Sequence, residues 1–335
     1  MDLSVESVAG WVKDVRLTSR GLEHKETGHR IPLDPATLSD MFRWVHYDRT
    51  LRRLPTLRAE PLKVCFTPTR ARPWYFARAI VDHLGAEVVD TPADADIVWA
   101  FEDSTLSEPL IAPPSKITIN AGTTDISKSR IGEVMEDVFG YSLSVDPEIY
   151  DGAMVSKSEI NGAHDGRIVK GPAPRHEGQV YQVLVDNRID DDAVEDLRTT
   201  IMGGRPVLVF RKRRSISDRF ANANSKVLLT ALDSVFSPEE IEQISQFAKA
   251  IKLDAGGLDV LRDRKTGRLF IVDANKTDMG PPLALPLAHK LAATRMMARA
   301  LAETIEAQQA LRPSAPTPAR ALPQPGDRPL IKVPA

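Results

Sequence analysis

The sequence predicts a mixed fold, in which a small parallel α/β domain precedes a larger α+β region. A chain of 335 residues is long enough for two or three domains. From residue 61 onward, short apolar strands alternate with a helix, as they do in a parallel sheet. Near the C-terminus, residues 256–276 have the two apolar strands and the glycine-containing turn of a β-hairpin.

The composition describes an ordinary globular protein. Hydrophobic residues make up 42% of the chain, and 44 basic against 46 acidic residues leave a net charge of −2. That balance gives no indication of a nucleic-acid or membrane partner. The single cysteine, Cys65, lies in an apolar run and cannot form a disulfide within the chain, which favours a reducing compartment. No secretory signal or apolar stretch of ~18 residues is present, so we expect a cytoplasmic protein.

The first half of the chain contains the predicted parallel unit. Residues 38–54 have helical spacing with arginines opposite the apolar side, but the fold of residues 1–60 is left open. No G-x-G-x-x-G motif follows the first strand of the parallel unit, so a dinucleotide-binding domain is not indicated. The elements expected in this unit are strands at 63–67, 86–90, 96–101 and 116–120, and a helix at 74–84.

The second half predicts further strands and helices around the hairpin. Seven prolines follow residue 312 with few large apolar groups, so we expect a disordered tail. A polar loop is expected at 212–226, before the last helices. The regular elements expected are helices at 127–139, 238–251 and 286–311, and strands at 153–158, 166–170, 180–186, 192–201 and 205–211.

The hairpin predicts a divalent-metal site. A turn centred near residues 265–266 places Asp259 opposite Asp273 and Leu261 opposite Ile271, and period-two alternation puts Asn275 on the same face. Directly opposed carboxylates repel one another, and a divalent cation removes that conflict. Carboxylate and amide oxygens are ligands that Mg²⁺ prefers. The alternative is a solvent-facing hairpin with two unpaired acids, which the apolar pair on the same face argues against.

The same residues resemble a known family signature. The run at 254–263, the run at 270–277 and the Gly280-Pro281-Pro282 loop are similar to the C-terminal motif of the ATP-grasp superfamily. The resemblance is to its glutathione synthetase-like and ribosomal-protein-modifying ligase-like branches. Residue Asn120, followed by Lys128 at a helix start, is similar to the beginning of the ATP-binding region in that superfamily. The second acid of the motif is usually glutamate, so the shorter Asp273 leaves open whether one or two ions bind.

The resemblance implies a division of the chain. It covers roughly residues 61–310 and implies a pre-ATP-grasp domain at 61–122, a small ATP-binding subdomain at 123–186 and a C-terminal subdomain with the metal site at 187–311. Residues 1–60 form an N-terminal extension in this division, and residues 312–335 form the tail.

The resemblance also implies which residues contact the nucleotide. Lys128 and Lys157 are expected to contact phosphates, and Gly162 and Gly166 belong to a flexible loop over them. A surface lysine beside a simple turn is the alternative for Lys157. Residues 181–187 resemble the hinge strand that pairs with adenine, and an ordinary core strand is the alternative there. The expected hinge contacts are Gln182, Val183, Leu184, Val185 and, near the ribose, Asp186.

Two arginines are expected to stabilise the transferred phosphoryl group. The resemblance points to Arg198 and Arg213, because guanidinium groups bind phosphate and carboxylate oxygens in a bidentate manner. The other basic residues of 211–214 are interpreted as a solvated turn. Asn224, in the polar loop, is a further candidate for contact with substrate or metal.

The resemblance implies an ADP-forming carboxylate–amine ligase. ATP with Mg²⁺ (Mn²⁺ as the alternative ion) would phosphorylate a carboxylate, and an amine or thiol would attack the acyl phosphate. The expected partners are ATP and small-molecule or peptide substrates, with no nucleic acid or membrane, and homo-oligomer formation is left open. Two other functions are compatible with the sequence: a kinase for a non-carboxylate acceptor, and a nucleotide-binding scaffold or regulator without turnover.

Overall fold

The computed structural model describes residues 15–18, 21–25, 30–31, 34–60, 62–163, 165–220 and 225–310. The predicted C-terminal tail and the candidate Asn224 lie outside these residues. Four sheets are formed in this part of the chain. No helix in it has both the length and the apolar character needed to cross a membrane.

The described N-terminal residues form a small antiparallel sheet and one helix. The sheet contains β1 (Val15–Thr18), β2 (Gly21–His24) and β3 (Arg30–Ile31). Helix α2 (Pro35–Leu51) begins where the Asp34 side chain accepts a hydrogen bond from a first-turn backbone N–H. Its later residues reach the core, where Tyr47 and Leu51 are buried.

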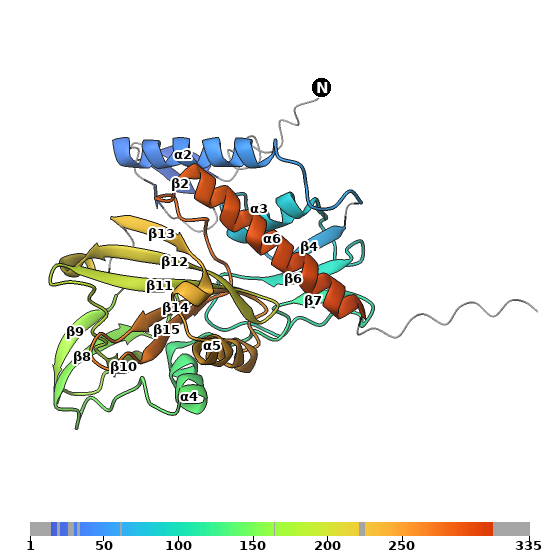
Figure 1. The fold of residues 1–335 in the computed structure, drawn as a ribbon. Coiled ribbons are helices and arrows are strands. Elements are labelled where there is room, and N and C mark those ends of the chain that lie inside the picture. The colour runs from blue at the N-terminus through green and yellow to red at the C-terminus, as the bar shows by residue number, and fades with distance from the viewer. Residues whose placement is uncertain are drawn as a thin grey trace, which may run out of the picture.

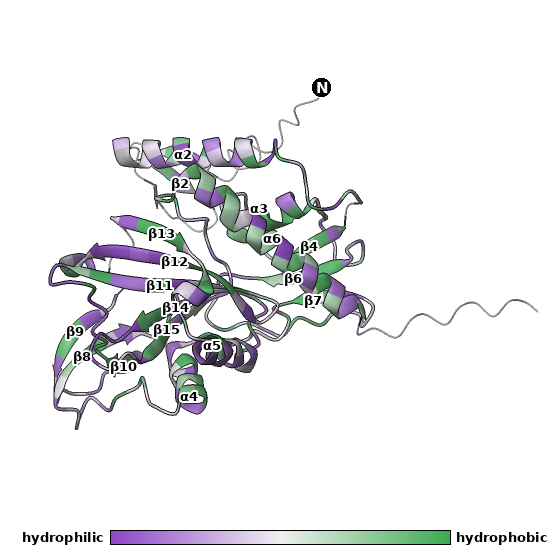
Figure 2. Ribbon diagram, in the orientation of Figure 1, coloured by the Kyte–Doolittle hydropathy of each residue, from purple (hydrophilic) through white to green (hydrophobic). Residues whose placement is uncertain are grey.

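A parallel sheet follows, as the alternating pattern predicts. Its strand order is β5-β4-β6-β7, and all three neighbouring pairs are parallel. Buried apolar side chains run along β4 and β6, which carry hydrophobic colour in Figure 2. Helix α3 packs against α6 beside this sheet (Figure 1). The elements are β4 (Lys63–Pro68), α3 (Phe76–Leu84), β5 (Glu87–Val88), β6 (Ile97–Phe101) and β7 (Ile117–Ile119).

The next unit is a helix with a three-stranded antiparallel sheet. Helix α4 (Lys128–Phe139) begins at the Ser127 cap and ends at Gly140, whose positive φ of 75° suits glycine. The sheet has the order β10-β8-β9. Its strands are β8 (Gly152–Ser158), β9 (Arg167–Gly171) and β10 (Gln179–Val183).

The largest sheet is antiparallel and has the order β13-β12-β11-β14-β15. One of its faces packs with α4 and α5, and part of the other packs with α6 and the parallel unit. Figure 1 shows α6 running beside α3, with α4 and α5 at the opposite side of the large sheet. The elements are β11 (Ala193–Met202), β12 (Arg205–Ser215), β13 (Lys226–Thr230), α5 (Pro238–Ala250), β14 (Ala255–Arg262), β15 (Leu269–Asn275) and α6 (Leu287–Ala310).

Two predicted boundaries are wrong. Strand β12 continues to Ser215, through the first residues of the expected polar loop. Its basic side chains are compatible with a sheet because they pair with acids across from them on β11, including Glu195 and Asp196. The purple colour of β11 and β12 in Figure 2 marks this hydrophilic stretch. Strand β10 ends at Val183, three residues before the predicted end.

Candidate active site

The β14–β15 hairpin brings two carboxylates together. Asp259 lies directly opposite Asp273, which confirms that part of the predicted register. Beyond this pair the register shifts, so that Val260 lies opposite Ile271 and Val272 is left over as a bulge. The predicted pairing of Leu261 with Ile271 is therefore wrong.

The bulge also changes the environment of the acids. Ile271 turns into the core beside Val260, and both are fully buried, while Leu261 pairs with Phe270. The acidic face consequently lacks the apolar Ile271 expected there. Val272 has no partner on β14, and its carbonyl accepts a hydrogen bond of 2.9 Å from Lys157 Nζ.

Two predicted lysines converge on Asp273. Lys157, on β8, reaches β15 through its contact with Val272, and Lys128, at the first turn of α4, lies 3.6 Å from Asp273 Oδ1. Lys128 also donates to the Ile160 carbonyl at 3.1 Å. Burial lowers the pKa of Lys157 to about 8, against the opposing effect of the Asp273 charge. Both ammonium groups are thus held beside the same carboxylate.

Asp273 has an unsatisfied oxygen. Within the described residues, its Oδ1 is buried and accepts no hydrogen bond. Burial raises the pKa of this carboxyl above its ordinary value, and the Lys128 and Lys157 charges offset only part of that effect. A buried oxygen without a hydrogen bond is costly, so this atom is available to a cation.

Asp259 is held in a different way. Arg198, from β11, places Nη1 2.9 Å from Asp259 Oδ1 and also forms an ion pair with Asp278 in the loop after β15. Burial opposes ionisation of Asp259, but the charges of Arg198 and Lys212 keep its pKa at about 2. Gly257 leaves the space for this arrangement, because a Cβ there would lie 2.6 Å from Arg198 Nε and would overlap the Asp278 carboxylate.

The donor set fits one divalent ion that is completed by ligand oxygens. Asp259 and Asp273 supply two facing carboxylates, and Mg²⁺ needs only one or two when phosphates provide the rest. Asn275 lies on the same face, but its Oδ1 already accepts hydrogen bonds from Thr277 N at 2.7 Å and Thr277 Oγ1 at 3.2 Å. In the part of the chain that is described, no group of three or more acidic, histidine or cysteine side chains is arranged for a metal.

The glycine loop lies next to these lysines. It connects β8 and β9, and Gly162 has a φ of 73°, which favours glycine. Gly166 lies against Phe220, with a Cβ position 3.1 Å from the ring. Asn161 N donates to Thr105 Oγ1 at 2.8 Å. The loop is thus tied both to the parallel unit and, through Ile160, to Lys128.

The expected adenine hinge is partly engaged in protein hydrogen bonds. Val183 N donates to the Leu143 carbonyl at 2.9 Å, and the Val185 carbonyl accepts from Asn187 N at 3.1 Å. Leu184 lies between them, and no backbone hydrogen bond of this residue is found in the described structure. The predicted contact through Val183 N–H is therefore already satisfied.

Of the two remaining hinge residues, only Asp186 is held by an ion pair, whereas Gln182 Nε2 is buried and has no hydrogen-bond partner among the described residues. Gln182 is buried, and Asp186 forms a bidentate ion pair with Arg188 at 2.6 and 2.8 Å. Hydrogen bonding to Arg188, against a smaller effect of burial, lowers the pKa of Asp186 to about 2. The Asp186 carboxylate is therefore ionised and already paired.

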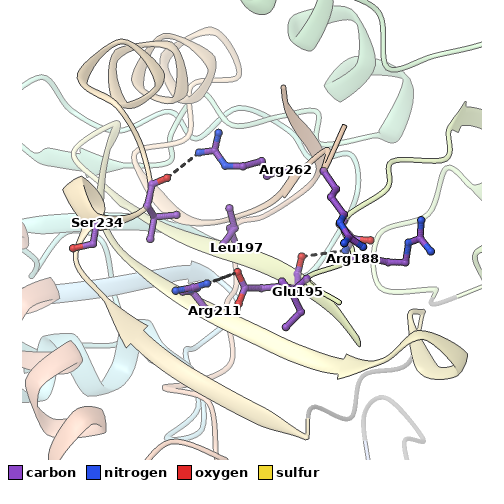
Figure 3. A pocket seen from close by; sticks show the side chains of 10 residues that line it. Arg188, Glu195, Leu197, Arg211, Ser234 and Arg262 are labelled. Carbon is purple, nitrogen blue, oxygen red and sulfur yellow. Dashed lines mark hydrogen bonds and ion pairs between the residues drawn. The ribbon is translucent and has the colours of Figure 1, made fainter. Parts of the chain in front are cut away.

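Arg213 does not join Arg198. Arg213 pairs with Glu195 at 2.7 Å, and alternation along β11 places Glu195 on the sheet face opposite Arg198. That face carries a cavity of about 230 Å³, and Figure 3 shows Arg211 and Glu195 joined across its floor beside Leu197. The cavity lies on the far side of the sheet from Asp259.

The prediction missed residues on the acidic face. Lys212 was assigned to a solvated turn, but the register that sets Arg198 opposite Phe210 puts Lys212 on the Arg198 face. Alternation from Arg198 across the Gly203-Gly204 turn would instead have placed Arg211 and Arg213 on that face, because the pairing shifts by one residue at the irregularity between Thr200 and Ile201. Asp278 had no sequence signal, because it belongs to an irregular loop.

Comparison with known proteins gives similarity only at the level of structure. No protein-family model and no curated protein matches the chain. Among solved structures, the ATP-grasp ligase PsnB complexed with a minimal precursor has a TM-score of 0.48 and 13% identity, covering 75% of this chain and 100% of that one. The D-alanine–D-alanine ligase from Bacillus anthracis gives 0.45 and 13%, covering 75% and 98%. The macrocyclase MdnC from Microcystis aeruginosa MRC gives 0.41 and 11%, covering 70% and 99%.

The fold is decided by the order and pairing of this chain's own elements. A parallel sheet comes first, then α4 with a three-stranded antiparallel sheet, then a five-stranded antiparallel sheet whose last hairpin carries the facing acids. This order of elements is the one that the resemblance of the sequence to the ATP-grasp superfamily implies. Lysines from the three-stranded unit lie next to carboxylates of the five-stranded unit.

Proposed function

We propose that this chain is an ADP-forming ligase that uses ATP and Mg²⁺ to activate a carboxylate for attack by an amine or thiol. The observation that carries the proposal is the facing pair Asp259–Asp273, with a buried, unsatisfied Asp273 oxygen beside Lys128 and Lys157. Two acids and two lysines at one place match the needs of a metal-bound polyphosphate.

The nucleotide is proposed to lie between the units 123–186 and 187–311. Lys128 and Lys157 supply positive charge for its phosphates, and the backbone around Gly162 and Gly166 can approach them closely. The base would pair with the free backbone groups of Leu184. The parallel unit at 61–122 contacts the loop after β15, which supports the acids.

Arg198 and the two acids are proposed to carry the phosphoryl transfer. Mg²⁺, held by Asp259 and Asp273, would neutralise phosphate charge and orient the terminal phosphoryl group. Arg198 stands beside Asp259 and can stabilise negative charge as a carboxylate oxygen attacks phosphorus and ADP leaves. The amine then attacks the acyl carbon, phosphate leaves, and the amine gives up a proton.

The test is turnover on a panel of carboxylates and amines. With Mg-ATP and the right pair, ADP, phosphate and an amide are produced in equal amounts, and both D259N and D273N abolish the reaction. The panel covers amino acids, short peptides and peptides with acidic side chains. Absence of coupled ADP and phosphate release across a broad panel, with Mg-ATP binding intact, would contradict ligase activity.

The two other functions are distinguished by the same assay. A kinase yields ADP with a stable phosphorylated compound and no free phosphate. A scaffold binds Mg-ATP without hydrolysis and co-purifies with a protein partner. The ion pairs that occupy Asp259 and Arg198 do not favour either of these over the ligase.

A further inference from the structure

A second cavity lies where helix α2 meets the start of α6. Its volume is about 340 Å³, and its lining consists of residues 283–287 in the loop before α6, Lys290 on α6, and Arg43 and His46 on α2. That volume is within the range of small-molecule sites. Figure 1 shows α2 beside the start of α6, on the side of the molecule away from α4 and α5. None of the lining residues belongs to β8, β14 or β15, so this cavity is separate from the facing acids.

Lys290 places a buried cation in the cavity. Only 3% of the residue is exposed, and its ammonium group forms no hydrogen bond or ion pair with any residue that the structure describes. Side chains of a helix point toward its N-terminus, so Lys290 is directed back toward the loop before α6. Burial lowers the pKa of Lys290, and the Arg43 charge adds to that effect, whereas Asp40 opposes it. A buried cation without a partner is costly, so an anion in the cavity would stabilise it.

Arg43 supplies a second positive charge at the edge of the cavity. It lies 3.7 Å from Asp40, but both side chains are about half exposed, so this pair is weak and leaves guanidinium donors available. The cavity of Figure 3 differs in this respect, because its Arg211 and Arg262 are bound to acids at 2.9 and 2.7 Å.

The start of α6 adds to the positive potential and also supplies apolar walls. The Pro286 carbonyl accepts hydrogen bonds from His289 N and Lys290 N at 3.0 Å each, which begins a helix of 24 residues. The N-terminal end of such a helix carries a partial positive charge. The apolar lining residues of the same loop are Leu283, Ala284, Leu285, Pro286 and Leu287. A ligand that matches both features has an anionic group and an aliphatic part.

The two helices that form the cavity are held together by buried hydrogen bonds. Tyr47 Oη on α2 lies 2.6 Å from Thr294 Oγ1 on α6, and Thr294 Oγ1 donates to the Lys290 carbonyl at 2.9 Å. These bonds connect α2 to the turn of α6 that carries Lys290. The cationic groups are thus arranged before any ligand arrives, which lowers the cost of binding.

We propose that the cavity between α2 and α6 binds a small organic carboxylate with an aliphatic group. The carboxylate accepts charge-assisted hydrogen bonds from Lys290 and Arg43, and the aliphatic group packs against residues 283–287. Inorganic phosphate would leave the apolar wall uncovered, so it fits this lining less well. The inference does not require that the facing acids hold a nucleotide, so it stands or fails separately from the proposed function.

The test is binding of 4-methylpentanoate to the full chain, measured by isothermal titration calorimetry. The comparison ligands are the neutral 4-methylpentanamide and inorganic phosphate, and both are expected to bind about tenfold or more weakly than the carboxylate. K290M keeps the apolar stem and removes the charge, so it weakens carboxylate binding about tenfold or more. R43M removes a partly exposed charge and weakens binding about threefold or more. K249M, at an exposed position on α5, leaves the constant within about twofold of wild type.

Several results would overturn the inference. They are unchanged carboxylate binding in K290M, equal binding of the amide, or phosphate binding as tight as that of the carboxylate. Weakening by K157M with K290M unchanged would place the ligand at the facing acids instead. R43M keeps the test valid if K290M does not fold, because Arg43 is exposed. Without ligand, K290M is expected to melt at a higher temperature than wild type, since it removes a buried charge. A lower melting temperature with unchanged binding would assign Lys290 a structural role and overturn the site.

Discussion

At the scale of single residues, the site is defined by how the two facing acids are satisfied. Asp259 has a guanidinium partner and a low pKa, whereas Asp273 has an unsatisfied oxygen and a raised pKa. Two chemically identical side chains at paired positions therefore differ in their partners and in the direction of their pKa shifts. A bound cation would stabilise the Asp273 carboxylate more than the Asp259 carboxylate, because the charge of Asp259 is already neutralised by Arg198.

The raised pKa of Asp273 predicts a stabilising substitution. A carboxyl with a raised pKa in the folded state binds more protons than in the unfolded state, so stability falls as pH rises through that pKa. Without metal at pH 7, D273N is therefore expected to raise the melting temperature by about 2 °C or more. The measurement is thermal unfolding against pH.

The control for D273N is the same thermal unfolding measurement at low pH. At a pH where the wild-type carboxyl is protonated, the two proteins should melt together. Mg-ATP should stabilise wild type and not D273N. A D273N protein less stable than wild type at pH 7 would show that the ion pair with Lys128, and not burial, dominates.

Gly257 gives a second prediction at this scale. In G257A, the methyl group must displace the Asp278 carboxylate and the Arg198 guanidinium, which breaks a buried ion-pair network. The expected loss in the free energy of unfolding is about 3 kcal/mol. Urea denaturation measures it. G267A, in the hairpin turn with nothing within 4 Å of its Cβ, should cost only about 1 kcal/mol, through its φ of 73°.

At the scale of elements, β11 and β12 carry two separate sets of charges. One face holds Glu195 with Arg211 and Arg213, and the other holds Asp196, Arg198 and the unpaired Lys212. Alternation in a strand makes adjacent residues in the sequence structurally remote. A single basic stretch can therefore support a structural ion-pair group on one face and a binding surface on the other.

This separation predicts a stability change without a binding change. E195A removes the partner of two arginines, and Glu195 is nearly buried, so unfolding should become easier by about 1–2 kcal/mol. Mg-ADP affinity should stay within about twofold of wild type, since this face is opposite the facing acids. Urea denaturation and calorimetry provide the two readouts. Loss of nucleotide affinity in E195A at full folding would place the nucleotide on the wrong face.

At the scale of the whole molecule, the loop after β15 joins the site to the parallel unit. Lys276 Nζ donates to Ser107 Oγ at 2.7 Å, and Phe76 N donates to the Asp278 carbonyl at 2.8 Å. Asp278 in turn holds Arg198. The parallel unit thereby contacts the loop that supports the acids.

Hydrogen exchange tests this arrangement in the full chain. Binding of Mg-ADP should slow amide exchange in residues 157–166 and 269–278, because both segments lie at the facing acids and would lose opening motions. Exchange in α2 should be unchanged, because this helix contacts α3 and α6 and is remote from the hairpin. Mass spectrometry of peptides resolves these segments. Protection confined to α2 and α6 would contradict the assignment.

The sequence by itself determined most of the elements from residue 61 onward, and it determined the facing acids. The alternation around residues 259 and 273 and the glycine-containing turn are local, so the Asp259–Asp273 pair followed from counting along one hairpin. The starts of α4 and α5 were likewise encoded nearby, by Ser127 and Ser237. These features depend on residues close together in the chain.

Only the tertiary structure decided which groups meet at those acids. Contacts between distant parts of the chain build this site. Lys157 and Lys128 approach β15 at the Val272 bulge, and Asp278 forms an ion pair with Arg198. Whether Lys212 or Arg213 lies on the sheet face of Arg198 depended on how far β12 extends and on its register with β11. Register is set by long-range packing of both sheet faces, and a shift of one residue exchanges every side chain between them. That is why the hairpin was predictable and its cationic surroundings were not.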